Sequence, residues 1–183
     1  MQMRESQDRG PGPEDSPPGP DRPGGIPEDG PLELLPMAPE DLTEVAALEA
    51  VCFADPWSRK SFEAELAAPP ISWPRILRMG DRLAGYMIAW FVEDETHLAN
   101  IAVAPWARRR GYAEEMLRML VREAYLRGSR MIVLEVRASN HGAVALYEKN
   151  GFTPGGIRRN YYNHPREDAV VLVRSLRLQE AST

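Results

Sequence analysis

The stretch VAPWARRRGYAEEM, from Val103 to Met116, decides the fold prediction. It leaves an apolar run, passes three consecutive arginines at 108–110 and reaches Gly111. From Gly111 to Arg127 apolar residues recur in pairs at a four-residue step, which is typical of a helix that buries one face. The first turn of a helix presents unpaired backbone N–H groups and the positive end of the helix dipole. The stretch therefore predicts an anion site where a strand leads into a helix.

This stretch alone leaves two interpretations open. One is a phosphate-binding loop, in which Gly111 lets the backbone approach the ligand, Ala113 stays small and the arginines add forked donors. The other is a solvated arginine run that happens to precede a helix. A Walker loop is excluded because no Gly-Lys-Ser/Thr follows, and a dinucleotide fingerprint is excluded because its three-glycine spacing is absent.

Hydrophobic periodicity and turn residues predict the elements on both sides of this stretch. A first strand is followed by two helices, and Pro69-Pro70 ends the second helix. The predicted helices are 38–53 with a start near Asp41, 57–68 capped by Ser58, 111–127, and 139–151 capped by Ser139 or Asn140. The predicted strands are 32–37, 73–80, 82–94, 96–105, 130–138, 152–162 and 168–176.

The first 31 residues differ in composition from the rest of the chain. They contain eight prolines and six glycines, and Ile26 is their only large branched aliphatic residue. Such a segment cannot bury enough apolar surface to offset the entropy lost on ordering. We therefore expect a disordered, acidic tail over residues 1–31 and a single folded domain over residues 32–183.

The charge and cysteine content limit the classes of partner and location. The tail carries seven acidic residues and three arginines, which leaves twenty acidic residues against nineteen Lys plus Arg in residues 32–183. Direct nucleic-acid binding is not expected, because it needs a basic face. The sequence shows no signal-peptide pattern and no apolar run long enough to cross a bilayer, and Cys52 is the only cysteine. We expect a cytoplasmic protein without membrane contact or internal disulfide; a monomer is favoured, although the sequence does not set the oligomeric state.

Several motifs resemble the GNAT acyltransferase superfamily. Arg108-x-x-Gly111-x-Ala113 is similar to its acetyl-CoA pyrophosphate loop, with Ala113 where many relatives have glycine. The stretches NIAVAP, LEVRASN, ALYEKNGF, IRRNYY, REDAVV and DPWS resemble the bacterial ribosomal-protein-alanine N-acetyltransferases of that superfamily; they begin at Asn100, Leu134, Ala145, Ile157, Arg166 and Asp55. The resemblance covers residues 32–176. It implies an α/β (α+β) fold of the GNAT type, with a central mixed and mostly antiparallel sheet flanked by about four helices.

The resemblance also implies an activity, which is transfer of the acetyl group of acetyl-CoA to the N-terminal α-amine of a protein. The implied substrate is an alanine-starting ribosomal protein of the small subunit, and direct attack in a ternary complex is expected. The residues assigned to acetyl-CoA are Ile101, Ala102, Val103, Arg108, Arg109, Arg110, Gly111, Tyr112, Ala113, Glu114 and Asn140; those assigned to the peptide are Trp57, Arg158, Tyr161 and Tyr162. No metal is expected, because the histidines show no metal-ligand spacing.

Two residues are candidates for the proton transfers. Glu135 lies in the most apolar predicted strand, where desolvation favours a raised pKa and hence a better base; the alternative is an ion pair with Arg137 on the same face of that strand. Tyr147 lies in the next helix and is either a packed core tyrosine or a proton donor to the thiolate. The resemblance implies that Glu135 is the general base and Tyr147 the general acid.

Other activities stay open on the sequence. The same fold acetylates lysine side chains or small amines in some members, and a noncatalytic acyl-CoA sensor that uses the acidic tail as a partner arm is a further alternative. Asn140 has two compatible roles, as a helix cap and as a coenzyme contact.

Overall fold

A computed structural model describes residues 30–176 of the chain. Most of the predicted tail, residues 1–29, lies outside the described residues. Within residues 30–176 the chain forms one seven-stranded sheet in the order β1-β2-β3-β4-β5-β7-β6, with four α-helices. All neighbouring strands run antiparallel except β4 and β5. The predicted mixed, mostly antiparallel GNAT fold is therefore confirmed.

The element bounds follow the predicted ranges closely. The strands are β1 Leu32–Pro36, β2 Ser72–Met79, β3 Arg82–Val92, β4 Glu95–Val103, β5 Met131–Arg137, β6 Thr153–Asn163 and β7 Arg166–Ser175. The helices are α1 Leu42–Cys52, α2 Arg59–Leu66, α3 Tyr112–Leu126 and α4 His141–Lys149, and the short 3-10 helices are η1 Pro39–Asp41 and η2 Pro105–Ala107.

Local capping residues explain where the helices begin. The Ser58 hydroxyl accepts a hydrogen bond from the Ser61 N–H at 3.1 Å, which starts α2. Asn140, rather than Ser139, caps α4, because its side-chain oxygen accepts from the Ala143 N–H at 3.1 Å. These bonds satisfy backbone donors that would otherwise lack a partner in the first turn.

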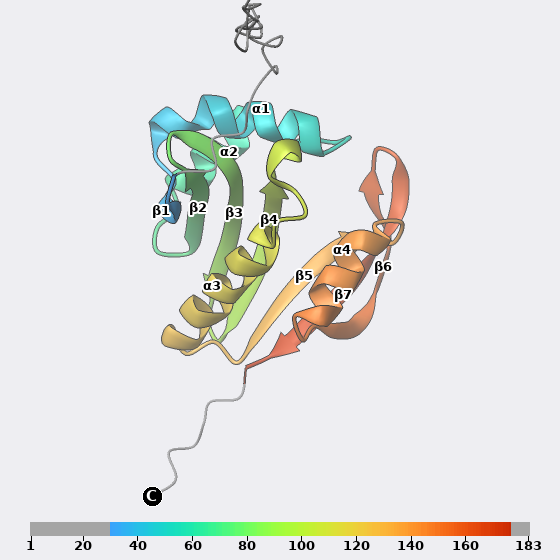
Figure 1. The fold of residues 1–183 in the computed structure, drawn as a ribbon. Coiled ribbons are helices and arrows are strands. Elements are labelled where there is room, and N and C mark those ends of the chain that lie inside the picture. The colour runs from blue at the N-terminus through green and yellow to red at the C-terminus, as the bar shows by residue number, and fades with distance from the viewer. Residues whose placement is uncertain (1–29, 177–183) are drawn as a thin grey trace, which may run out of the picture.

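The core explains the layered arrangement. In β3, seven consecutive residues from Leu83 to Ala89 are buried, which requires cover on both faces of the sheet. On one face α3 buries Met116, Leu117, Leu120 and Ala124, the predicted four-residue step. In Figure 1, α3 and α4 lie over this same face, while α1 crosses the upper end of the sheet and α2 packs beside it.

The parallel pair β4–β5 is short, and this feature positions the site. The two strands pair only from Glu95 opposite Met131 to Leu98 opposite Leu134. A register shift in β3–β4 pairing leaves Ala99 as an extra residue at the same level, and such a bulge bends the strand that carries it. Beyond this level the strands diverge (Figure 1), because β4 continues along β3 while β5 continues along β7. The sheet therefore opens between residues 99–103 and 135–137.

Candidate active site

A cavity of about 540 Å³ lies at the opening between β4 and β5. Its walls come from β4, β5, α4, β6 and the loop between α1 and α2, which we call the α1–α2 loop (residues 53–58). It brings together six of the predicted site residues, Trp57, Ile101, Glu135, Asn140, Tyr147 and Tyr162. Its size is within the range of small-molecule sites.

Glu135 is the first residue of β5 beyond the segment that pairs with β4. Its side chain is 17% exposed and forms an ion pair with Arg158 of β6, with 3.1 Å between Oε1 and Nη1. The alternative pairing with Arg137 is not what the structure shows. Arg137 instead binds Glu167 at 3.3 Å and donates to the carbonyl oxygens of Pro165 and His164. Arg158, predicted to bind the peptide, therefore holds the candidate base.

Tyr147 is buried and also lines the cavity. Its ring packs edge-on against Phe152, with 5.7 Å between the ring centroids. Burial raises the pKa of the Tyr147 phenol well above its usual value, because desolvation disfavours the phenolate. The hydroxyl therefore keeps its proton at neutral pH and can act only as a donor toward an anion.

One side of the cavity is built by aromatic residues. The Tyr162 hydroxyl donates to the backbone oxygen of Glu135 at 3.4 Å, and the Arg137 guanidinium lies 4.1 Å from the Tyr162 ring centroid. Burial raises the pKa of Tyr162 to about 12. Tyr161 packs edge-on against Tyr162 but is 44% exposed and does not line the cavity. Trp57 faces this side from the α1–α2 loop and packs on Phe62, with ring centroids 5.6 Å apart.

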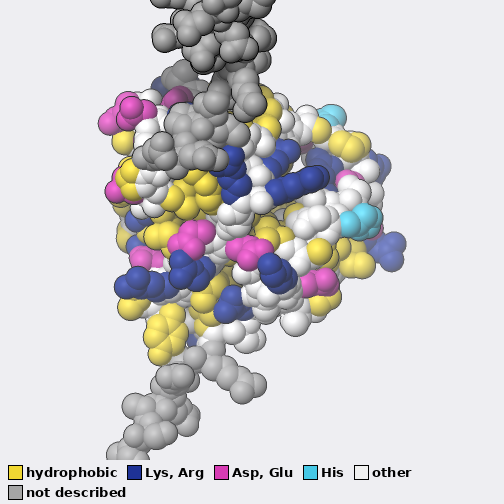
Figure 2. Space-filling view, in the orientation of Figure 1, with side chains coloured by type: hydrophobic (Ala, Val, Ile, Leu, Met, Phe, Trp, Pro, Cys, Tyr) yellow, Lys and Arg dark blue, Asp and Glu magenta, His cyan; other side chains and the backbone are white. Residues whose placement is uncertain are grey.

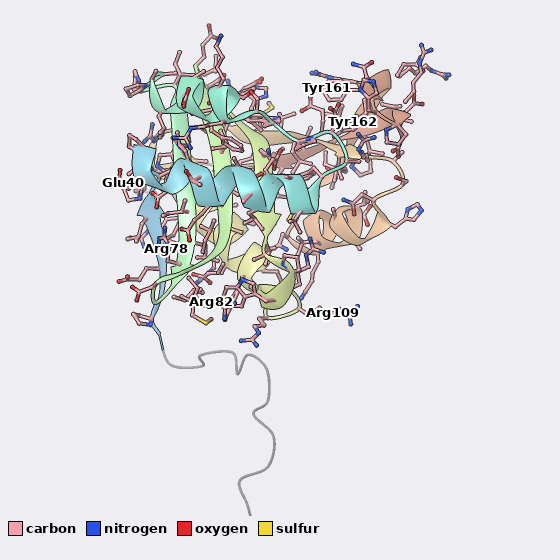
Figure 3. The ribbon with its side chains drawn as sticks, turned by 90° about the horizontal axis from the view of Figure 1, so that it is seen from above. Glu40, Arg78, Arg82, Arg109, Tyr161 and Tyr162 are labelled. Carbon is pink, nitrogen blue, oxygen red and sulfur yellow. The ribbon has the colours of Figure 1, made fainter. Side chains whose placement is uncertain are left out.

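The predicted anion loop lies on the other side of the molecule. Gly111 has φ 80°, in the left-handed region, and a Cβ added there would meet nothing within 4 Å. Backbone geometry therefore requires glycine, and space remains above the loop for a ligand. Arg109 also has a positive φ, 62°, and Figure 3 shows it pointing outward on the side opposite Tyr161 and Tyr162. Arg110 is likewise exposed.

Arg108 behaves differently from its two neighbours. Its Nε donates to the Val103 backbone oxygen at 3.2 Å and its Nη2 approaches the Cys52 sulfur at 3.4 Å. The Cys52 thiol contacts the same oxygen at 3.8 Å. The side chain of Arg108 is therefore folded back onto the end of β4, although all three arginines are exposed.

A second cavity, of about 630 Å³, adjoins the start of α3. Gly111 and Glu114 line it from α3, and Lys149 lines it from the end of α4. The Lys149 ammonium binds the Glu114 carboxylate at 2.7 Å. Tyr112 and Ala113, in the first turn of α3, are half-buried. Figure 2 shows Lys and Arg side chains interspersed with Asp and Glu side chains on this face of the molecule.

β4 has a free edge beyond the segment that pairs with β5. Ile101 lines the first cavity, Ala102 is buried against β3, and Val103 ends the strand. Because β5 does not pair with residues 99–103, main-chain groups on this edge are available to an extended ligand, as in strand addition. The Val103 oxygen is already engaged by Arg108.

Comparisons with known proteins agree with this geometry. The sequence model of the Acetyltransferase (GNAT) family matches residues 42–152. The chain belongs to the GNAT acetyltransferase family. This GNAT chain is 39% identical over 136 residues to the putative ribosomal protein bS18-alanine N-acetyltransferase of Bacillus subtilis (strain 168), covering 74% of this chain and 90% of that protein. It is also 39% identical over 134 residues to the ribosomal protein bS18-alanine N-acetyltransferase of Escherichia coli (strain K12), covering 72% and 89%.

A solved structure agrees with these sequence matches. The crystal structure of the ribosomal-protein-S18-alanine N-acetyltransferase from Escherichia coli superimposes on this GNAT chain with a TM-score of 0.75 at 34% identity. The superposition covers 83% of this chain and 98% of that one. The predicted family and fold are confirmed on both grounds.

Sequence reasoning missed two polar residues of the GNAT cavity, Glu49 and Asn100. Glu49 is buried on α1, where the predicted apolar face includes Val45 and Leu48. The sequence did offer a signal, which was a carboxylate four residues after Val45 on an apolar helix face. Charged residues are rarely buried without a partner, so such a carboxylate indicates a buried polar contact.

Two negative findings apply to the described part of the chain. Residues 30–176 contain no group of three or more His, Cys, Asp or Glu side chains arranged to hold a metal ion. No helix among these residues has the length and apolar character needed to cross a membrane.

Proposed function

We propose that the chain transfers the acetyl group of acetyl-CoA to the N-terminal α-amine of a protein, with an alanine-starting small-subunit ribosomal protein as its substrate. The observation that carries the proposal is that Glu135 and Tyr147, the implied base and acid, line one cavity at the opening of the sheet. The names of the 39%-identical relatives support the choice of substrate.

The first step removes a proton from the amine. Glu135 takes this proton, either directly or through one water, as the amine nitrogen attacks the thioester carbonyl carbon. A free α-amine has a pKa of about 7.7–8.0, against about 10.4 for lysine, so the base has less work to do on an N-terminus at neutral pH. Arg158 holds the carboxylate at 3.1 Å and orients it toward the cavity.

The second step releases the coenzyme. The N–C bond has formed in the first step; the C–S bond now breaks, and the departing thiolate takes the proton of the Tyr147 hydroxyl. Exchange with solvent then returns a proton to Tyr147 and removes the one held by Glu135. Burial raises the pKa of Tyr147 and so makes it a weaker acid than a phenol in bulk water. Burial also disfavours the coenzyme thiolate in the same cavity. Because burial raises the pKa of the thiol as well as that of the phenol, the proton transfer between them stays feasible.

The coenzyme is proposed to lie across the opening. The main-chain groups of Ile101 and Ala102 bind the pantetheine amides, and the residues 108–113 together with Glu114 surround the phosphates. The open space above Gly111 and the N–H groups of the first turn of α3 fit a diphosphate. The NH₂ group of Asn140 is left for the coenzyme, because its capping bond uses the side-chain oxygen.

Direct transfer in a ternary complex is consistent with the placement of the two binding regions. Arg109 at the donor loop and Tyr161 and Tyr162 at the peptide side lie on opposite sides of the molecule (Figure 3). The donor and the acceptor therefore enter from different directions and meet at Glu135 and Tyr147, without a covalent acetyl-enzyme.

The test is a peptide library with varied first residues, incubated with enzyme and acetyl-CoA and read by mass spectrometry. We expect acetylation at the α-amine and preference for alanine at the first position. Acetylation confined to internal lysines would replace the proposed substrate class, and coenzyme binding without turnover on any peptide would favour a sensor.

A further inference from the structure

Glu49 is a buried acidic side chain that the proposed chemistry does not use. Its relative exposure is 1%, although it lies on α1 at the wall of the active-site cavity. A buried carboxylate is tolerated when donors satisfy it. Three donors do so here, from Trp57, Asn100 and Tyr86.

The three hydrogen bonds divide between the two carboxylate oxygens. Oε1 accepts from the backbone N–H of Trp57 at 2.9 Å and from the side-chain amide of Asn100 at 3.2 Å. Oε2 accepts from the hydroxyl of Tyr86. Burial raises the pKa of Tyr86, and the charge of Glu49 raises it further, so Tyr86 remains the donor in this bond.

The two partners of Oε1 belong to different walls of the cavity. Trp57 is part of the α1–α2 loop, and Asn100 lies on β4 just beyond the bulge where β4 leaves β5. The partner of Oε2, Tyr86, lies inside the sheet on β3 and does not line the cavity. One oxygen therefore joins the peptide wall to the free strand edge, while the other anchors the carboxylate to the core.

We propose that Glu49 is a positioning residue for the acceptor peptide, acting through Trp57 and Asn100. Its Oε1 fixes the distance between the α1–α2 loop and β4 and so keeps the peptide side of the cavity at a constant width. The inference rests on the proposed function only for the identity of the substrate. The hydrogen bonds of Glu49 to Trp57 and Asn100 do not depend on it. It places the effect on peptide binding and not on acetyl-CoA, whose proposed loop is at residues 108–113.

Three variants separate this role from general stability. Glu49→Ala removes both connections. Glu49→Gln keeps an oxygen for Trp57 and Asn100, and its NH₂ can donate to the Tyr86 hydroxyl, so it is the conservative rescue. Tyr86→Phe is the matched control, because it removes the core bond to Oε2 and leaves both bonds to Oε1 in place.

The experiment measures KM for an alanine-starting peptide, KM for acetyl-CoA, kcat and Tm for the whole chain. For Glu49→Ala we expect peptide KM to rise about tenfold, as for loss of a charge-assisted hydrogen bond, with acetyl-CoA KM within about twofold. Glu49→Gln should restore peptide KM to within about threefold of the parent value, and Tyr86→Phe should lower Tm without raising peptide KM. If Glu49→Ala does not fold, Asn100→Ala, which removes one connection and leaves Glu49 in place, should raise peptide KM at least about threefold.

Two results overturn the proposal. One is a peptide KM that rises as much in Tyr86→Phe as in Glu49→Ala; the other is an unchanged peptide KM in both Glu49→Ala and Asn100→Ala. Amide hydrogen exchange over residues 53–58 is the readout that needs no substrate. It should quicken in Glu49→Ala and not in Tyr86→Phe. If the parent chain acetylates no peptide, the proposed function fails while the exchange measurement still decides whether Glu49 fixes the loop.

Discussion

Replacing Glu135 with glutamine tests the base with the smallest change in shape. The variant keeps the side-chain volume and loses the charge that accepts the proton. General-base catalysis is worth about 10²–10⁴-fold, so kcat should fall at least about a hundredfold, equivalent to roughly 2.7 kcal/mol of barrier. The structural cost is smaller, because the only ion pair lost is to Arg158, which is 54% exposed; such pairs contribute about 0–1 kcal/mol to stability. Unfolding therefore cannot account for the expected loss.

The assay follows release of the coenzyme thiol with a saturating alanine-starting peptide. Acetyl-CoA affinity is measured by calorimetry and Tm by thermal unfolding. We expect acetyl-CoA affinity to stay at the parent value and Tm to fall by no more than about 4 °C. Glu123→Gln is the control, because Glu123 also loses a bond to an arginine, Arg127 at 2.7 Å, but lies on α3 outside the cavity. A kcat within about threefold of the parent would remove Glu135 from the role of base.

Three further predictions concern the acid, the donor loop and the acid limb of stability. Tyr147→Phe should lower kcat by about tenfold or more with little change in Tm, and the raised pKa of Tyr147 means that its ionisation should cause no loss of rate below about pH 10 in a pH–rate profile. Gly111→Ala and Gly128→Ala both place alanine at a positive φ, 80° and 78°, with open space around the new Cβ. Each should therefore lower the free energy of unfolding by about 1–2 kcal/mol. Only Gly111→Ala should also weaken acetyl-CoA binding in a titration, and equal acetyl-CoA affinities of the two variants would contradict the loop assignment. The pKa of Glu167 is lowered, chiefly by the hydrogen bond from the Ser139 N–H. The ionised Glu167 therefore stabilises the folded chain above the unfolded pKa of about 4.3, and this stabilisation is lost as the pH falls. Glu167→Gln should flatten the fall of Tm in acid, and an unchanged slope of Tm against pH would contradict this.

The elements could be predicted because their signals are local. Ser58 and Asn140 act within three residues of their own positions, and Gly111 and Gly128 adopt the left-handed conformations that only glycine takes without strain. The nearly continuous apolar run at 130–138 predicted a strand in the buried middle of the sheet, and β5 does pair with β4 on one side and β7 on the other. Family motifs singled out Glu135 and Tyr147 from the sequence, and the structure has both lining one cavity.

The partners of the site residues were less predictable, because they depend on contacts between distant segments. The same-strand spacing of Glu135 and Arg137 suggested an ion pair between them. Arg158 of β6 binds Glu135 instead, and it does so across β7, which lies between β5 and β6 in the sheet. Likewise Asn100 lies 51 residues from Glu49, and no local pattern links them. The contact of Arg108 with Cys52, 56 residues away, also depends on tertiary structure.

The short junction between β4 and β5 has a consequence for how the activity is distributed along the chain. Among the described residues, those before the turn at Gly128 form one group of strands, β1 to β4, with the loop at 108–113; those after it form a second group, β5, β7 and β6, with Glu135 and Tyr147. In the proposed mechanism the donor is held largely by the first group, while the proton transfers belong to the second. Neither group carries a complete site, so catalysis depends on how firmly four pairs of residues hold the two groups together. Engineers who wish to change the acyl donor can therefore work before residue 128 and leave the acid and base untouched.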